Sequence, residues 1–256
     1  TETVTAEIYK ETFPEYQRKV KSMLSSLDRP KWMRASPKEE LKELIQSGAK
    51  AILLYGPPRT GKTRLIDQII NRSSDQRSTI QIHDGWSYDN LVEGLMPKKD
   101  GSWVWQSGPL KEAIEAGKKY IVLEEINRTA ISQALGEVFS LIEDAYRGAD
   151  NAIILRSKNE FYIPEDVIIF MTMNTIDKST EEVDDALMGR LAAVEILPRA
   201  EDLSEMLSVN AIPEALRQKI LELFAEIQTI YPLGHGYFAG LRGEITTTEL
   251  LRYYRT

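Results

Sequence analysis

The stretch Ala51–Thr63 reads A-I-L-L-Y-G-P-P-R-T-G-K-T and decides the fold of this chain. Its first five residues are apolar and partly β-branched, which favours a buried strand. The next eight, Gly56–Thr63, fit the pattern G-x-x-x-x-G-K-[ST], a loop whose backbone N–H groups surround the phosphates of a nucleotide. The apolar positions in the following L-I-D-Q-I-I complete the strand, loop and helix that this pattern requires.

Each fixed residue of the loop has a physical task. Gly56 and Gly61 permit backbone torsions and a close approach that a Cβ atom would forbid. Lys62 places a cation on the β and γ phosphates, and Thr63 supplies a hydroxyl for Mg²⁺. The amides that open the helix point at the anion, so the loop and the helix dipole act together. The predicted nucleotide-binding residues are Gly56, Pro57, Pro58, Arg59, Thr60, Gly61, Lys62, Thr63 and Arg64.

The composition is that of an ordinary globular protein. The chain has 256 residues, of which 42% are hydrophobic and 28% charged, enough for one large domain or a large domain plus a small one. No apolar run approaches the ~18 residues that a membrane-spanning helix needs, and the N-terminus lacks the pattern of a secretory signal. We therefore expect a cytoplasmic protein with no membrane segment.

Residue counts also limit the metals and partners to expect. With no cysteine and 2 histidines, disulfides and thiolate metal sites are excluded and a zinc centre is disfavoured, so the expected metal is Mg²⁺ bound with nucleotide. A net charge of −7 and a pI near 5.2 do not indicate a surface that binds nucleic acid over its whole area. The chain begins at Thr1 without an initiator Met, so we expect that it is processed or is part of a longer protein.

The remaining pattern alternates strands with helices. Strands are predicted at 51–55, 79–83, 120–123, 161–163, 167–173 and 194–197, and helices at 37–45, 64–71, 109–117, 131–146 and 184–191. This order predicts an α/β fold with a mostly parallel sheet flanked by helices, which binds nucleotide at the carboxyl ends of its strands. We place an N-terminal helical extension and linker at 1–35, the nucleotide-binding domain at 36–198, and a small helical lid domain at 199–256, with the longest helix at 213–230.

Three of the four tryptophans, Trp86, Trp103 and Trp105, lie in the loop-rich segment 84–108. They could stack on bases or stabilise a β-hairpin around Asp100 and Gly101. We favour the hairpin, because D-G between apolar residues is a hairpin signal.

Polar residues follow two of the predicted strands. The third strand ends in Glu124 and Glu125, an arrangement that matches the second half of a nucleotide hydrolase. Glu124 would hold the Mg²⁺ shell, usually through water, and Glu125 would orient and polarise the attacking water. Asn174 ends the strand at 167–173 and could help to position that water near the γ phosphate, although a strand-end cap is also plausible for Asn.

The order of phosphate loop, acidic strand, Asn, later Arg and helical lid resembles the AAA+ superfamily. Within it, four segments are similar to the McrB-type motor subunits of modification-dependent restriction systems. They are I-H-D-G-W-S-Y-D-N-L-V-E-G-L-M-P at 82–97, E-E-I-N-R-T-A-I-S-Q-A-L-G-E at 124–137, M-N-T-I-D-K-S at 173–179 and L-G-H-G-Y-F at 233–238.

The resemblance implies a homo-oligomeric ring, usually hexameric, in which a neighbouring subunit supplies an arginine to the nucleotide. Arg190 aligns with that finger position, and Arg128 and Arg147 are further candidates for the subunit boundary. The catalytic set would then be Lys62, Glu125, Asn174 and Arg190, with Thr63 and Glu124 at the metal.

The family also implies particular partners and a particular nucleotide. McrB-type motors use GTP rather than ATP and activate a McrC-like nuclease subunit that stimulates hydrolysis, in a restriction complex that acts in antiviral defence. A separate N-terminal domain recognises DNA in that family, and residues 1–50 are too few for one. DNA would therefore be bound through another domain or subunit.

Three departures from the family pattern stand in the site: Arg59 replaces the usual Gly, Glu124 replaces the usual Asp, and the arginine cluster is reduced to M-G-R at 188–190. No residue indicates the choice of base, so GTP and ATP both stay open. A MoxR-like AAA+ chaperone that remodels a protein partner is the alternative, because G-P-L-K-E-A-I at 108–114 resembles that branch as much as McrB. A third possibility is a nucleotide-dependent assembly scaffold without hydrolysis.

Overall fold

The computed structural model of this chain describes residues 36–176, 181 and 183–243. Three parts of the chain lie outside the described residues: the N-terminal helical extension and linker predicted at 1–35, part of the segment 173–179, and the chain after residue 243. The chain divides into two compact units, residues 1–40 and residues 41–256, with the boundary inside helix α3 (Pro37–Gln46). As predicted, α3 begins at Pro37, where Ser36 and Glu39 form a reciprocal cap with hydrogen bonds of 2.8 and 3.3 Å.

The central sheet has five strands in the order β2-β5-β8-β1-β9. They are β1 (Ala51–Gly56), β2 (Arg77–Gln81), β5 (Tyr120–Glu124), β8 (Ile168–Asn174) and β9 (Ala192–Glu195). Every pairing in this sheet is parallel, which confirms the predicted fold class. β2 begins at Arg77, earlier than the predicted Thr79, and β9 likewise begins before the predicted Val194.

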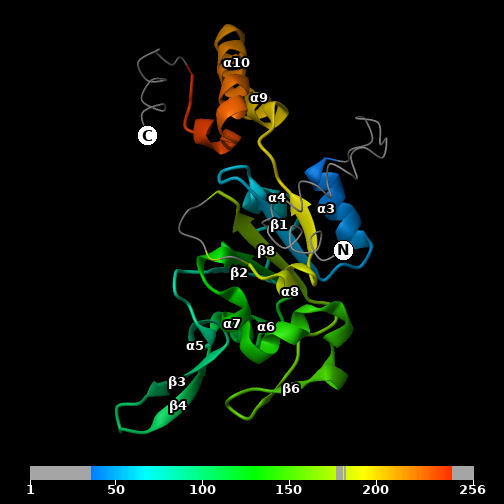
Figure 1. The fold of residues 1–256 in the computed structure, drawn as a ribbon, viewed down its shortest axis with the longest axis vertical. Coiled ribbons are helices and arrows are strands. Elements are labelled where there is room, and N and C mark those ends of the chain that lie inside the picture. The colour runs from blue at the N-terminus through cyan, green and yellow to red at the C-terminus, as the bar shows by residue number, and fades with distance from the viewer. Residues whose placement is uncertain (1–35, 177–180, 182, 244–256) are drawn as a thin grey trace, which may run out of the picture. The chain divides into compact units, whose positions relative to one another are not determined.

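Both faces of the sheet are covered. Along β1, Leu53 packs into one hydrophobic cluster, whereas Ile52 and Leu54 pack into another. Because successive strand residues point to opposite faces, the two clusters lie on opposite sides of the sheet. Helix α4 (Lys62–Ile69) packs on one face, and α6 (Pro109–Glu115) and α7 (Ile131–Leu135) pack on the other, as Figure 1 shows around the sheet.

The helix predicted at 131–146 is wrong in its length. Helix α7 ends at Leu135, and the chain continues as 3-10 turns η3 (Gly136–Ile142) and η4 (Asp144–Tyr146). Gly136 has φ 55° and ψ −130°, a conformation that an α-helix cannot contain. The amphipathic pattern continues through this break, which is why periodicity alone predicted one helix.

The predicted hairpin is present. Strands β3 (Glu93–Pro97) and β4 (Trp103–Ser107) pair antiparallel on either side of Asp100 and Gly101 and extend away from the central sheet (Figure 1). Its base is held by the fully buried Glu93, whose carboxylate accepts a hydrogen bond of 2.8 Å from Lys111 in α6. A second, short hairpin joins β6 (Ile153–Ile154) and β7 (Glu160–Phe161), where a longer strand at 161–163 was predicted.

Beyond the sheet, the described part of the chain is mostly helical. Helices α9 (Ala200–Val209) and α10 (Glu214–Ile230) and the turn η6 (His235–Phe238) share a hydrophobic cluster that is separate from those of the sheet. Further short helices are α5 (Tyr88–Leu91), η2 (Ile126–Arg128), η5 (Ala149–Asn151) and α8 (Asp185–Met188). No helix among the described residues has the length and apolar character needed to cross a membrane.

We call residues 233–238 the lid segment. The boundary of the lid domain near residue 199 stays a proposal.

Candidate nucleotide site at the carboxyl edge of the sheet

The phosphate loop joins the end of β1 to the start of α4. Gly56 has φ 147°, and a Cβ atom at this position would collide with the carbonyl oxygen of Ile196. Gly61 caps α4 in the left-handed region, at φ 86°. Arg59 also has a positive φ, of 58°, which is unfavourable for a residue with a side chain. This backbone geometry explains why glycine suits position 59.

Lys62 lies at the centre of the loop. It is 7% exposed, and its ammonium group donates hydrogen bonds to the carbonyl oxygens of Gly56, at 3.0 Å, and Pro57, at 2.7 Å. Burial lowers the pKa of Lys62 to about 8, although the charge of Glu125 opposes that shift. Thr60 closes the loop with a hydrogen bond of 3.0 Å to Pro57. The buried cation and the helix N-terminus together favour an anion at this place.

Strand order brings the other predicted residues to the same edge. In the pairing of β1 with β8, Gly56 lies opposite Asn174, and the N–H of Thr175 donates to the Gly56 carbonyl at 3.2 Å. In the pairing of β5 with β8, Leu123 lies opposite Met171, so the acids that follow Leu123 reach the level of the phosphate loop. Parallel strands end at one edge of the sheet, and the loop, both acids and Asn174 meet there.

Glu125 occupies a turn held from two sides. Its backbone is left-handed, with φ 57° and ψ 50°, and its N–H donates to Thr172 Oγ1 at 3.1 Å. One carboxylate oxygen accepts a hydrogen bond of 2.8 Å from Arg128 Nε. A left-handed non-glycine residue is strained, and such strain is concentrated at functional sites. The strain and the two contacts fix the direction of this carboxylate.

Glu124 and Thr63 carry oxygen atoms of the kind that hold a magnesium ion. Glu124 is half-buried, and its Oε1 atom is buried with no hydrogen-bond partner among the residues that the structure describes. A buried carboxylate oxygen without a donor favours a cation. Mg²⁺ is commonly held by one or two protein oxygens together with substrate phosphates. The Glu124 carboxylate and the Thr63 hydroxyl would supply the protein oxygens, and a nucleotide in the phosphate loop would supply the phosphates.

Two residues of this site were missed in the sequence. Asn127 is 4% exposed, and its side-chain amide donates to the carbonyl oxygen of Asn174 at 2.8 Å, so it ties the acidic turn to the end of β8. Thr172 is 3% exposed and accepts the Glu125 N–H. Asn127 stands inside the E-E-I-N-R motif, but nothing in its spacing indicated that the side chain would reach another strand.

The three arginine candidates have different surroundings. Arg128 pairs with Glu125, as described above. Arg190 donates to the Ala186 carbonyl at 2.6 Å, lies 3.3 Å from a Glu143 carboxylate oxygen, and stacks on Phe139 at 4.7 Å. Its contacts are therefore with α8 and η3, on its own subunit.

Arg147 is not suited to a subunit boundary. It is 4% exposed and donates to the carbonyl oxygens of Val167, at 3.1 Å, and Ile142, at 3.0 Å. Burial lowers the pKa of Arg147 to about 10. A guanidinium enclosed by its own chain's carbonyls has a structural task, so the prediction that Arg147 faces a neighbouring subunit is wrong.

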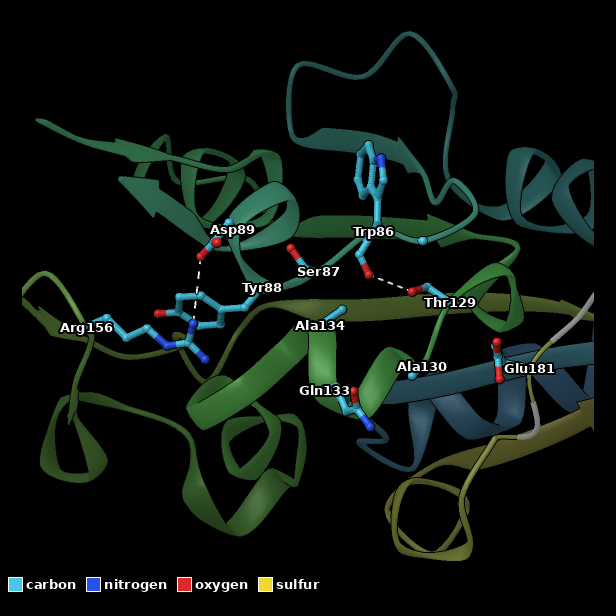
Figure 2. A pocket seen from close by; sticks show the side chains of 11 residues that line it. Trp86, Ser87, Tyr88, Asp89, Thr129, Ala130, Gln133, Ala134, Arg156 and Glu181 are labelled. Carbon is cyan, nitrogen blue, oxygen red and sulfur yellow. Dashed lines mark hydrogen bonds and ion pairs between the residues drawn. The ribbon is translucent and has the colours of Figure 1, made fainter. Parts of the chain in front are cut away.

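A pocket of about 480 Å³ lies to one side of this site. Figure 2 shows it between the segment that carries Trp86, Tyr88 and Asp89 and the start of α7. Thr129 closes one wall with a hydrogen bond of 2.6 Å to the Trp86 carbonyl, and the Arg156 guanidinium stacks on Tyr88 at 3.9 Å (Figure 2). Its lining contains none of the predicted nucleotide or metal residues, so it is distinct from the candidate nucleotide site.

Comparison with known proteins agrees with this geometry. Residues 51–191, more than half of the chain, match the family model described as the AAA domain (dynein-related subfamily). The matched range contains the phosphate loop, both acids, Asn174 and Arg190.

Three relatives are similar over different lengths. The McrB subunit of a type IV methyl-directed restriction enzyme from Escherichia coli (strain K12) is 36% identical over 218 residues, which are 74% of this chain and 47% of the relative. Midasin from Dictyostelium discoideum is 25% identical over 82% of this chain and 4% of its own length. The denitrification regulatory protein NirQ from Stutzerimonas stutzeri is 30% identical over 35% of this chain and 32% of its own length.

This chain thus spans about half the length of the McrB relative and a small part of midasin. The family match, the parallel sheet and the site at its carboxyl edge agree with one another. The chain belongs to the dynein-related subfamily of AAA domains, within the AAA+ P-loop NTPases, and is McrB-like.

Proposed function

We propose that this chain hydrolyses a nucleoside triphosphate, GTP or ATP, as the motor subunit of a McrBC-like restriction and defence complex. The observation that carries the proposal is the meeting of the phosphate loop, the acidic turn and Asn174 at one edge of the sheet, where Gly56 lies opposite Asn174. Similarity to McrB over 74% of this chain supports the choice of complex.

The residues of the chain would divide the work of hydrolysis. Lys62 would bind the β and γ phosphates, and Thr63 and Glu124 would hold Mg²⁺, which when bound supplies positive charge against the phosphates. Glu125 would accept a proton from water as the water oxygen bonds to the terminal phosphorus and the bond to the diphosphate breaks. Asn174 would orient that water, and Arg190 of a neighbouring subunit would stabilise charge on the transferred group.

The first test compares turnover of GTP and ATP by the wild type, Glu125→Gln and Arg190→Ala. Loss of a positioned general base costs about 10²- to 10⁴-fold, and loss of an arginine finger about 10³- to 10⁵-fold. Nucleotide binding should survive in both variants, because neither residue belongs to the phosphate loop. Unchanged turnover in both variants would refute the assignment of the site.

The base preference has a separate test. Thermal unfolding is followed with Mg²⁺ and non-hydrolysable GTP or ATP analogues. A ligand at about 100 times its dissociation constant adds roughly 2.7 kcal/mol to the stability of the folded state. We expect a larger increase with the GTP analogue, from the likeness to McrB, and a larger increase with the ATP analogue would reverse that choice.

The second candidate function is that of a MoxR-like ATPase which remodels a protein partner. Similarity to NirQ over 90 residues supports it, together with G-P-L-K-E-A-I at the start of α6. Stimulation of turnover by a McrC-like nuclease subunit would favour the restriction complex. Stimulation by a protein partner without nuclease activity would favour the chaperone.

A further inference from the structure

The lid segment touches the phosphate loop at several points. The backbone N–H of Gly236 donates to the carbonyl oxygen of Arg59 at 2.9 Å. The guanidinium carbon of Arg59 lies 4.6 Å from the centre of the Tyr237 ring, within the range of a cation–π interaction. His235 is 8% exposed, and its Nε2 lies 3.6 Å from the place where a Cβ atom on Gly61 would stand. The contacts therefore reach the middle of the loop and the end of the loop that leads into α4.

Two glycines let the backbones come this close. A Cβ atom on Gly236 would lie 2.8 Å from the Arg59 carbonyl oxygen, and one on Gly234 would collide with the carbonyl oxygen of Pro58. The lid segment consequently packs directly on the backbone of the phosphate loop. A change in the shape of the loop must carry the lid segment with it or break these contacts.

Arg59 has a conformation that its own backbone does not favour. Its φ of 58° lies in the left-handed region, where a Cβ atom is unfavourable and glycine is not. Such a conformation persists when the surrounding contacts hold it. The contacts from Gly236 and Tyr237 hold Arg59 in this conformation. A glycine at position 59 would fit the backbone but would lack the cation that contacts the Tyr237 ring.

We propose that Arg59 is a positioning residue that clamps the phosphate loop to the lid segment, so that phosphate binding and the position of the lid are coupled. This proposal rests on the proposed function, because it takes the loop as the nucleotide site. Coupling of this kind is reciprocal: if the lid contact helps the loop to bind nucleotide, bound nucleotide must strengthen the lid contact by the same factor.

The test is a double-mutant cycle on nucleotide affinity. The variants are Arg59→Asn, Tyr237→Leu and the pair, and the measurement is the dissociation constant of a fluorescent, non-hydrolysable nucleotide with Mg²⁺. Asn tolerates the left-handed region but carries no cation. Arg59→Lys and Tyr237→Phe keep the charge and the ring, whereas Tyr231→Leu, at a lid tyrosine of similar exposure, 43% against 37%, is the control.

Arg59→Asn and Tyr237→Leu should each raise the dissociation constant about two- to fivefold, as expected for loss of a cation–π contact near the surface. The double variant should have a dissociation constant no higher than that of either single variant, because both changes remove the same contact. Tyr237→Phe and the Tyr231→Leu control should bind like the wild type, and Arg59→Lys, which keeps the charge, should bind more tightly than Arg59→Asn. The proposed clamp would be refuted if Arg59→Asn left the nucleotide dissociation constant unchanged. It would also be refuted if the factors by which the two single variants raise this constant multiplied in the double variant.

Amide hydrogen exchange gives a second readout that does not depend on turnover. Nucleotide should slow exchange at the Gly236 amide in the wild type and have little effect on it in Arg59→Asn. Equal slowing in both proteins would contradict the coupling.

Lys62→Ala separates the two proposals. If the wild type binds nucleotide and Lys62→Ala does not, the assignment of the nucleotide site is supported, independently of the result of the double-mutant cycle. If the wild type itself does not bind, the proposed function and the clamp both fail.

Discussion

Asn127 is a buried side chain whose amide donates to the Asn174 carbonyl at 2.8 Å, and Thr172 similarly holds the N–H of Glu125. Neither residue belongs to the phosphate loop. Both connect the acidic turn to β8, which itself lies beside the phosphate loop. At the scale of single residues, the geometry of the candidate site thus depends on polar groups that motif patterns do not include.

Replacing Asn127 with Ala should lower the free energy of unfolding by about 1–3 kcal/mol, because the part-buried carbonyl of Asn174 loses its donor. Urea denaturation measures this. Asn151→Ala is the matched control: Asn151 also donates to a main-chain carbonyl, that of Arg147 at 2.9 Å, but its side chain is exposed and water can replace it. The control should lose no more than about 0.5 kcal/mol. Equal losses in the two variants would contradict the role given to Asn127.

The break after α7 is decided by packing between elements. A Cβ atom on Gly136 would lie 2.6 Å from the ring of Tyr88. The Tyr88 hydroxyl donates to the Glu137 carboxylate at 2.9 Å, and burial raises the pKa of Tyr88 above its usual value. The Tyr88 ring therefore occupies the space that a side chain at position 136 would need in the observed structure.

Gly136→Ala distinguishes a continuous helix from the observed break. In a continuous helix the change would add about 0.5–1 kcal/mol of stability. In the observed structure it should cost at least about 2 kcal/mol, since it combines a left-handed backbone with a collision against Tyr88. Gly117→Ala, at φ 70° with nothing within 4 Å of the added carbon, should cost about 1 kcal/mol in the same thermal unfolding assay. A gain of stability in Gly136→Ala would show that the break is wrongly placed.

At the scale of the whole molecule, the chain holds a phosphate loop and acids at one edge of the sheet, whereas Arg190 contacts Phe139 and Glu143. A site that needs this arginine would be completed by a second copy of the chain. Head-to-tail contacts of this kind generate closed rings when the rotation between subunits closes. The proposed ring predicts that two variants, each inactive alone, restore turnover when they are mixed.

Mixing two inactive variants tests the shared site. Lys62→Ala lacks the proposed phosphate-binding cation, and Arg190→Ala lacks the proposed finger, so each alone should be inactive. In an equimolar mixture, half of the subunits are Arg190→Ala and keep an intact loop. If the variants assemble at random, half of these subunits have a Lys62→Ala neighbour, which keeps the arginine. Random rings should therefore show about a quarter of the wild-type turnover per subunit. Turnover should also rise with protein concentration in the wild type. A mixture that stays inactive at every concentration would contradict an arginine supplied by a neighbour.

The sequence by itself determined the local features of this protein. The phosphate loop, the acidic end of the third strand, the D-G hairpin and most strands were predictable, because each depends on residues close together in the chain: glycine geometry, hydrophobic periodicity and turn preference. The α/β class followed from their order.

Only the tertiary structure decided which distant residues meet. It placed Gly56 beside Asn174, buried Arg147, ended α7 at Leu135, just before the Gly136 that lies against Tyr88, and laid the lid segment on Arg59. The physical reason is that burial, collision and long-range hydrogen bonds depend on how elements pack, and no periodicity along the chain records that packing. Arg59, which the sequence marked only as a departure from a pattern, acquired its neighbours in this way.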